Sequence, residues 1–321
     1  MRSPKYVLAA ALVCAVVAAP SAVVARQDVT LRYKWTKGET LRYRLTQRTT
    51  STISGVPGSA GGMTVEQTLG QVWNEAVEDV AEDGTTTLRA TFESIIVDMS
   101  TPMGRMAYDT AHPESASDPG STLKSMLANM VGESFTVALS PAGVVLRVEG
   151  LTRLGDKMFA SLPANAATML GGFRQVMSDD AMKQNMSQTY LMFPDRPLKA
   201  GDTWNDQVTT VNPIGTITIS SASALKTVAG AADTQVVTLA STLTLRQDSS
   251  TPGAGPMGMT VKMDEATGER ETLFNAGRGR IERVTTNLTM PMSISGTGPD
   301  GTAMNMRTVS VSTTTLELVR P

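Results

Sequence analysis

The strongest constraint on the fold is an alternation of apolar and polar residues that recurs along most of the chain. In the stretch 280–296, from Val284 onward, Val, Leu, Met and Ile residues share one parity, and Thr, Arg and Asn residues fill most of the other. Its apolar set is Val284, Leu288, Met290, Met292 and Ile294. Successive side chains of a β-strand point to opposite faces, so a period of two indicates strands with one apolar face. Such strands are typical of an antiparallel sheet with one covered face, because parallel strands are usually apolar on both faces.

The same pattern predicts the positions of individual strands. Residues 29–36 and 41–53 alternate on both sides of the turn Lys37-Gly38-Glu39, which predicts a β-hairpin. A second hairpin is expected over 135–148. Further single strands are predicted at 63–79, 85–100, 234–246, 280–296 and 302–319. The last of these strands changes parity near 313–315, which predicts a β-bulge.

Helical spacing is confined to the middle of the chain. Apolar residues recur at i, i+3, i+4 and i+7 in Leu123, Met126, Leu127 and Met130. A second helical segment is expected over 151–183, where Pro163 and Gly171-Gly172 should break it into pieces. The predicted fold is therefore mainly β: long antiparallel strands form a curved, half-open, barrel-like sheet with a helical insert at 121–183. This shape is analogous to that of periplasmic lipoprotein carriers, although a shared architecture does not fix function.

The first 25 residues are typical of a secretory signal peptide. Arg2 and Lys5 precede an apolar run from Tyr6 to Ala19, Pro20 ends that run, and Val23-Val24-Ala25 offers small residues before a cut. The prediction is an exported protein, periplasmic or extracellular. Its mature part, 26–321, is expected to be one large β-rich domain or two lobes, 26–185 and 186–321.

Two alternatives to cleavage exist. Cys14 could carry a lipid anchor, but the apolar run before it is short and the preceding tripeptide does not fit the usual lipoprotein pattern. The segment Tyr6–Ala25 is also about long enough to remain as a membrane anchor. Pro20 and the small residues after it favour cleavage. Cleavage would remove Cys14, the only cysteine of the chain.

Charge and residue content make several classes of function improbable. The chain has 28 basic and 30 acidic residues and no basic run, so no nucleic-acid partner is predicted. No apolar segment after the signal approaches membrane-spanning length. With one histidine, His112, and no cysteine after the signal, zinc and iron sites built on those ligands are not expected. No catalytic motif is convincing, so the prediction is a protein without enzymatic activity, metal or cofactor.

Methionine is unusually frequent. The chain contains 20 Met against six Phe, five Tyr and three Trp. Methionine is flexible and polarizable, so this content fits either an irregular core or an adaptable apolar cavity. If a cavity exists between the sheet and the helices, its candidate lining residues are Met126, Met130, Met158, Phe159, Met169 and Phe173.

Two short segments resemble a known family. They are Lys37-Gly38-Glu39-Thr40-Leu41-Arg42-Tyr43 and the stretch 193–204, which contains Pro194-Asp195-Arg196-Pro197 and Gly201-Asp202-Thr203-Trp204. Both are similar to segments of an uncharacterised family of secreted bacterial proteins and lipoproteins. The resemblance implies no catalytic residues. In the second segment the prolines should keep the chain extended, Gly201 should turn it, and Trp204 should anchor the next strand.

These observations leave two hypotheses for function. The first is a non-enzymatic envelope protein that binds an apolar or amphiphilic ligand, such as a lipid, between sheet and helices. The alternative is a structural or protein-interaction module that engages another envelope protein and has no small-molecule ligand. A continuous apolar cavity would favour the first, and a filled core with an exposed apolar patch would favour the second.

Overall fold

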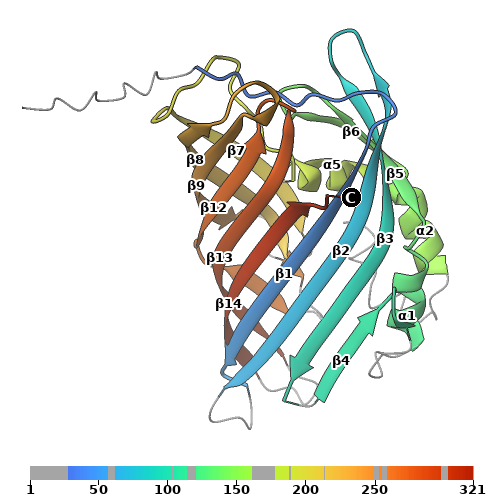
Figure 1. Cartoon of the computed structure of the whole chain (residues 1–321). Coiled ribbons are helices and arrows are strands. Elements are labelled where there is room, and N and C mark those ends of the chain that lie inside the picture. Colours follow the sequence, from blue (N-terminus) through green and yellow to red (C-terminus); the bar gives the residue numbers. More distant parts are fainter. Residues whose placement is uncertain are drawn as a thin grey trace, which may run out of the picture.

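The computed structural model describes residues 28–56, 62–102, 104–113, 121–160, 178–187, 189–212, 214–248, 253–254, 259–297 and 303–320. The predicted signal peptide lies outside these residues. Within them, one antiparallel sheet of 14 strands dominates the fold, and it does not close into a barrel (Figure 1). The sequence-based prediction of a mainly β protein with a half-open antiparallel sheet is therefore confirmed.

Eleven strands follow one another along the main path of the sheet, in the order β6-β5-β3-β2-β1-β14-β13-β12-β9-β8-β7. Their bounds are β1 (Thr40–Ser54), β2 (Met63–Val80), β3 (Thr86–Thr101), β5 (Ser134–Leu139), β6 (Val145–Glu149), β7 (Thr203–Asn212), β8 (Gly215–Ala229), β9 (Val236–Gln247), β12 (Ala266–Asn275), β13 (Arg280–Thr297) and β14 (Ala303–Leu318). Three shorter strands pair at the side of this path: β4 (Gly104–Asp109), β10 (Gly253–Ala254) and β11 (Thr260–Met263).

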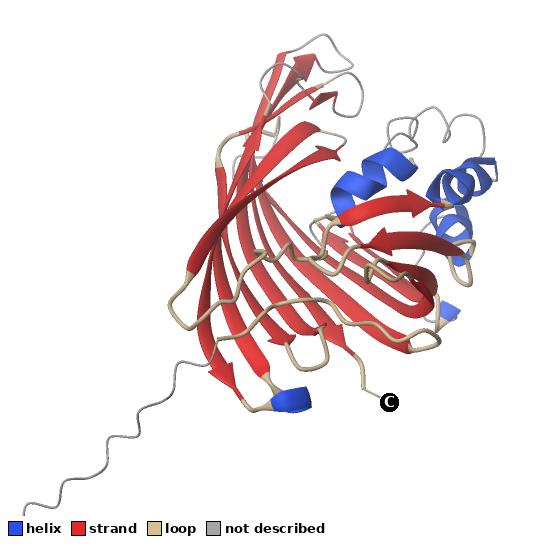
Figure 2. Ribbon diagram, turned by 90° about the horizontal axis from the view of Figure 1, so that it is seen from above, coloured by secondary structure: helices blue, strands red, loops and turns tan. Residues whose placement is uncertain are grey.

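The helices lie at one side of the sheet. They are α1 (Ser121–Ala128), α2 (Leu151–Ala160) and α5 (Asp179–Met186), and a short 3-10 turn, η2 (Ala232–Thr234), lies elsewhere. Figure 2 shows the sheet as an open trough with these helices gathered beside it. Pro163 and Gly171-Gly172, expected to break the second helical segment, lie outside the described residues. Within the described residues, no helix combines the length and the apolar character needed to cross a bilayer.

Helix α5 bridges the two ends of the sheet path. It contacts both β6 and β7, which are the first and last strands of the path and do not pair with each other. Ser178 caps this helix by accepting a hydrogen bond from the Ala181 backbone N–H at 3.2 Å. Asp179, in the first turn, also accepts from the backbone N–H of Leu151 at 2.8 Å and so ties α5 to α2. The trough is thus held across its opening by a helix rather than by strand pairing.

The predicted hairpin of 29–36 with 41–53 is wrong in its first half. Residues 41–53 lie in β1, but the segment before them forms one isolated bridge, between Val29 and Leu198, and no strand. Its other backbone bonds go to loops: Tyr33 N–H donates to Pro141 and Lys34 N–H to Gly279. The alternation is nevertheless real, because Val29, Leu31 and Tyr33 are buried. The segment is extended and crosses the sheet end, so its apolar side enters the core without ladder pairing.

The bulge predicted near 313–315 is also wrong. Strand β14 pairs with β1 and with β13 in unbroken register through this region. The parity change has another cause: Val309 and Val311 lie on the outer face and are 37% and 51% exposed, while Ser310 and Ser312 point inward and are buried. The apolar residues change face and the backbone does not.

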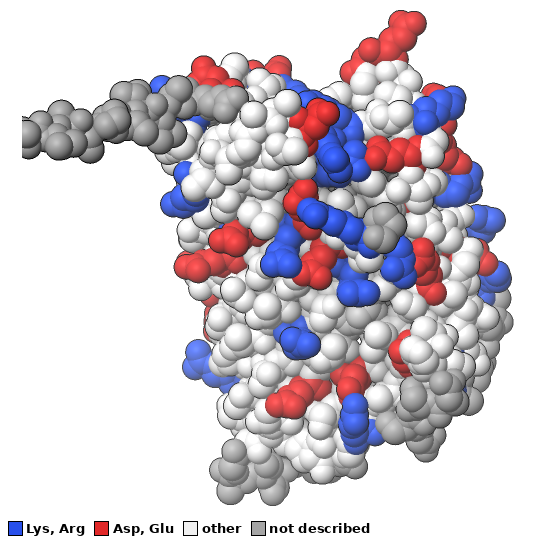
Figure 3. All heavy atoms as spheres, viewed as in Figure 1, with Lys and Arg blue, Asp and Glu red and all other residues white. Residues whose placement is uncertain are grey.

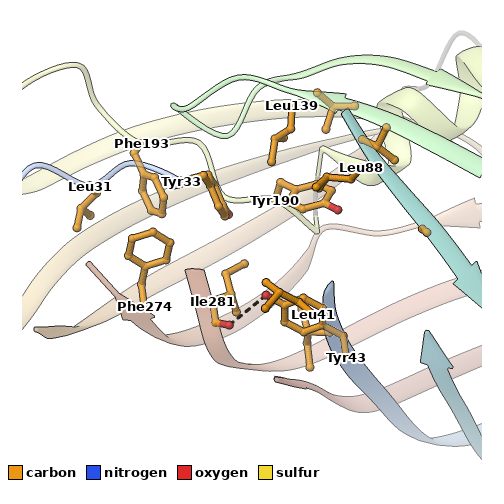
Figure 4. Packing of buried hydrophobic residues seen from close by; sticks show 14 of the residues in the cluster. Leu31, Tyr33, Leu41, Tyr43, Leu88, Leu139, Tyr190, Phe193, Phe274 and Ile281 are labelled. Carbon is orange, nitrogen blue, oxygen red and sulfur yellow. Dashed lines mark hydrogen bonds between the residues drawn. The ribbon is translucent and has the colours of Figure 1, made fainter. Parts of the chain in front are cut away.

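The main core lies at the end of the trough covered by the segment 29–35, the hairpin β5–β6 and the residues after α5 (Figure 4). Phe274 on β12 has no exposed surface, and its ring centroid lies 4.7 Å from that of Phe193 and 5.5 Å from that of Tyr33. Tyr43 of β1 donates a hydrogen bond to the carbonyl of Ile281 on β13 at 3.3 Å. Aromatic side chains from four separate parts of the chain therefore join the cover to the sheet.

A glycine in the turn of the β5–β6 hairpin allows this cover to pack closely. Gly143 has φ +90°, and a Cβ built there would lie 2.0 Å from the Leu191 carbonyl oxygen. We expect Gly143→Ala to destabilise the protein by about 1–3 kcal/mol, because it adds a backbone clash to an unfavourable φ. Gly38→Ala is the control, since Gly38 has φ +83° but nothing within 4 Å of a Cβ. Equal losses of unfolding free energy in urea for the two variants would contradict the close approach.

Candidate ligand-binding groove

The concave face of the sheet carries a groove next to the main core. Its volume is about 380 Å³, within the range of small-molecule sites. Eight of the residues that line it are apolar: Leu45, Ile217, Ile219, Leu245, Val284, Leu288, Met290 and Leu316. Six are neutral and polar: Gln47, Thr189, Thr210, Thr286, Ser312 and Thr314. The remaining lining residue is charged, and it is Arg270.

Strand register explains why these residues meet. Leu288 on β13 lies opposite Gly268 on β12, and Gly268 lies opposite Leu243 on β9. The next inward-facing positions along the strands place Ala266 opposite Leu245, and Leu245 opposite Ile219. With only glycine and alanine contributed by β12, the larger side chains of the flanking strands form a continuous apolar surface. This second cluster, Ile217, Leu243, Leu245, Met263 and Ala266 with its neighbours, is separate from the main core. We call it the apolar wall.

The opposite side of the groove, formed by β1 and β14, adds hydroxyl groups to the apolar side chains of Leu45 and Leu316. Across from the apolar wall, β14 places Ser312 opposite Leu288 and Ser310 opposite Met290. Ser310 shares a 2.8 Å hydrogen bond with Ser51 of β1. Both β14 serines are buried, at 3–4% exposure. The groove is therefore amphipathic across its width.

Arg270 lies where the groove meets a smaller cavity. On β12 it faces inward between Ser241 of β9 and Thr286 of β13, and its Nε donates to the Thr286 hydroxyl at 3.4 Å. Within the described residues no carboxylate forms an ion pair with it, while desolvation lowers its pKa and Asp206 opposes that shift. An arginine side chain nevertheless stays protonated near neutral pH. The groove thus holds a cation whose charge no direct contact neutralises.

The smaller cavity, about 40 Å³, shares Arg270 and Ile219 with the groove. The chain after α5, including Tyr190 and Phe193, covers it, and Trp204 and Asp206 of β7 close its far side. Asp206 is half-buried and accepts a hydrogen bond from the Gln207 backbone N–H at 2.8 Å. A negative charge therefore lies near Arg270 without pairing with it.

The segment 193–204 positions this end of the site. Asp202 accepts hydrogen bonds from the Lys199 backbone N–H at 3.2 Å and from Arg196 at 2.9 Å, which closes a turn at Gly201. Gly201 has φ +95°, as a turn residue of this kind requires. Strand β7 starts directly after the turn, and Trp204 packs partly buried against the main core. The structural role expected from the sequence fits this geometry.

Among the residues predicted from the sequence to line a cavity, those that the structure describes do not line the groove. Met158 is 1% exposed and belongs to the main core, while Met126 and Met130 pack half-buried against it. Phe159 lies in α2, whose last two side chains are not described, and Met169 and Phe173 lie outside the described residues. That these six residues contact a ligand stays a prediction.

A larger cleft lies at the end of the sheet, with a volume of about 810 Å³. Charged residues dominate its lining, and they pair with one another: Arg280 with Glu39 at 2.7 Å, and Arg320 with Glu282 at 3.4 Å. In the space-filling view, positive and negative side chains are likewise interspersed (Figure 3). Because three of its four arginines, Arg42, Arg280 and Arg320, already pair with acids, this cleft is a weaker candidate than the groove.

His112 and Glu75 are titratable residues of types used in catalysis, but the contacts of both are structural. His112 is exposed and its Nδ1 lies 3.0 Å from Asp109. Glu75 is 2% exposed in the main core, where its Oε1 accepts hydrogen bonds from Trp73 at 3.0 Å and Tyr190 at 2.9 Å. Burial raises the pKa of Glu75 above its usual value. No group of three potential metal ligands occurs among the described residues.

Comparison with known proteins gives one family and several distant structural likenesses. The model of a family of unknown function, DUF6263, matches residues 83–277, which is more than half of the chain. No curated protein matches.

Three solved structures illustrate the structural likenesses. A lipovitellin structure, described in terms of lipid–protein interactions, has a TM-score of 0.48 and 10% identity over 89% of this chain, which spans 26% of that chain. An outer membrane channel from Pseudomonas putida F1 has a TM-score of 0.27 and 9% identity, covering 88% of this chain and 97% of the channel. The β domain of the Bordetella autotransporter BrkA has a TM-score of 0.24 and 7% identity, covering 87% of this chain and 99% of that domain. These likenesses are too distant to bear on function.

Proposed function

Because the chain belongs to the DUF6263 family, whose function is unknown, we propose a function from its own geometry: binding of an apolar or amphiphilic molecule in the groove. The groove is proposed to act without catalysis. We further propose that the protein works in the cell envelope, in keeping with the predicted signal peptide.

The observation that supports binding most directly is the apolar wall. Leu245, Leu288 and Met290 line a groove of about 380 Å³, whereas the main core beside it is filled by side chains. Covering apolar surface gains roughly 25 cal/mol for each Å² removed from water, so a ligand with an apolar chain would bind favourably here. The hydroxyl groups of Ser312 and Thr314 on the opposite side suit a ligand that is not apolar throughout.

The test is uptake of a fluorescent fatty-acid probe by the purified mature protein. We expect saturable binding, and we expect Leu288→Trp to weaken it at least tenfold, because an indole would occupy the groove beside Gly268. The matched control is Val311→Trp. Val311 lies on the neighbouring strand but is 51% exposed on the outer face, so its replacement should leave binding unchanged.

The helical candidates are tested in the same assay. Met126→Trp should block uptake only if the ligand lies between α1 and the sheet, as the sequence suggested, and should have no effect if the ligand lies in the groove. Absence of probe binding to the wild-type protein would overturn the proposal. The interaction-module hypothesis would then be preferred.

A further inference from the structure

We propose that Arg270 binds the anionic headgroup of an amphiphile whose chain lies along the apolar wall. This inference rests on the proposed function and specifies the ligand class: a carboxylate or phosphate monoester joined to one long alkyl chain. In this proposal Arg270 selects the charge of the headgroup, and the groove selects the length and shape of the alkyl chain.

Arg270 lies on the inner face of the sheet, next to the apolar wall. Gly268 and Ala266, the next inward-facing residues of β12, have almost no side chain; Leu288 covers Gly268, and Ala266 is fully buried, so apolar residues of the flanking strands form the surface next to Arg270. Leu288 lines the groove together with Arg270, and Leu243 lines the smaller cavity with it. A headgroup held by Arg270 would therefore leave its chain lying directly on the apolar wall.

The positive charge of Arg270, which no ion pair among the described residues neutralises, favours an anionic headgroup. The guanidinium has five N–H donors, and its hydrogen bond to the Thr286 hydroxyl uses the one on Nε. The fork formed by its other nitrogens matches the geometry of a carboxylate or phosphate, and such charge-assisted bonds are stronger than neutral ones. Ser241 lies opposite Arg270 and shares a 2.8 Å hydrogen bond with Ser223, so further hydroxyl groups lie beside the same position.

The dimensions of the groove favour one chain of substantial length over a small anion. From Thr286, beside Arg270, to Met290, the last residue of β13 that lines the groove, the strand rises over four residue steps, or roughly 13 Å. A free inorganic anion would leave this apolar surface exposed to water. The volume of about 380 Å³ is near the lower end for ligand sites, which favours a single chain.

Asp206 supplies an internal comparison. It lines the smaller cavity together with Arg270 and lies close enough to affect its pKa without forming an ion pair. An anionic headgroup at Arg270 would be repelled by this carboxylate. Asp206→Asn should therefore strengthen binding of an anion, while Arg270→Gln should weaken it.

The experiment uses probes with the same twelve-carbon chain and different heads: laurate, dodecyl phosphate, 1-dodecanol and dodecyltrimethylammonium. Affinities are measured by calorimetry and by displacement of the fluorescent fatty acid. We expect laurate and dodecyl phosphate to bind roughly ten- to hundredfold more tightly than dodecanol, and the cation to bind most weakly. Acetate and inorganic phosphate alone should bind at least a hundredfold more weakly than the chain-bearing anions.

The variants separate headgroup recognition from chain binding. Arg270→Gln should remove the preference for anions while dodecanol affinity stays within twofold, and Arg270→Lys should retain part of the preference. Arg283→Gln is the matched control, since Arg283 lies on β13, faces outward and pairs with Glu317 at 3.0 Å. Equal thermal unfolding midpoints for Arg270→Gln and wild type establish that the fold is retained.

The outcomes are distinguishable. If dodecanol and laurate bind equally well and Arg270→Gln changes neither, the role of Arg270 is refuted while the groove remains a ligand site. If no chain-bearing probe binds, the proposed function fails together with this inference. If inorganic phosphate binds as tightly as dodecyl phosphate, Arg270 is an anion site unconnected with an alkyl chain, and the ligand class is wrong.

Discussion

Phe274→Ala is expected to lower the free energy of unfolding by about 3–5 kcal/mol. Phe274 has no exposed surface, and its ring packs on Phe193 and Tyr33, which belong to two segments that cover the sheet. Removing the ring would leave a cavity at the point where sheet and cover meet. The surrounding rings come from separate parts of the chain, so they cannot all move in to fill it.

Urea unfolding monitored by fluorescence measures the loss. The control is Leu273→Ala on the same strand, because Leu273 faces outward and is only half-buried. Its replacement should cost less than half as much as that of Phe274. Comparable losses at the two positions would mean that Phe274 does not join the cover to the sheet.

Glu75 is expected to give the second largest effect. Glu75→Leu keeps an apolar side chain in the main core but removes the acceptor of the Trp73 indole N–H and the Tyr190 hydroxyl. Each buried donor left without a partner costs about 1–3 kcal/mol, so a total loss of about 2–5 kcal/mol is expected. Glu75→Gln retains an acceptor oxygen and should stay within about 1 kcal/mol of wild type at neutral pH.

The same residue should make stability depend on pH with a defined sign. Burial raises the pKa of Glu75 in the folded state above the ordinary value of 4.5. Below that value both folded and unfolded states hold the proton, and Glu75 contributes no difference. As the pH rises from 4.5 toward the folded-state pKa, the unfolded chain releases the proton first, so stability falls.

Urea unfolding of wild type and Glu75→Gln across this pH range isolates the effect. Exposed acids such as Asp79 have lowered pKa values and act in the opposite direction, but they are common to both proteins and cancel in the comparison. The wild-type stability minus that of Glu75→Gln should decrease as pH rises. A difference that increases with pH would show that Glu75 is stabilised as a carboxylate.

Strand positions could be predicted well from the sequence because the sheet has one covered face. The stretch 280–296 corresponds to β13 (Arg280–Thr297) and 234–246 to β9 (Val236–Gln247). The same alternation misled for 29–36, since a segment that lies extended across a sheet end buries every second side chain without pairing. Periodicity reports which side chains are buried and does not report the backbone partner.

The groove was missed for a related reason. The prediction relied on methionine content and therefore pointed to the helices, where Met158 is a core residue. A signal for Arg270 was present in β12: an arginine at the same parity as Ala266, Thr272 and Phe274, all of which are buried. Burying a charged side chain at an inward position of a strand costs free energy. An inward-facing arginine therefore marks a candidate site more specifically than composition does.

The pairing of β1 with β14 determines when the protein can fold. These strands lie side by side in the middle of the sheet path, yet Leu45 pairs with Leu316 near the other end of the sequence. During synthesis, β1 has no partner on that side until β14 has emerged. Contacts so distant in sequence form slowly, and the waiting strand edge is prone to wrong associations. Such a chain depends on protection from aggregation until β14 is available to pair with β1.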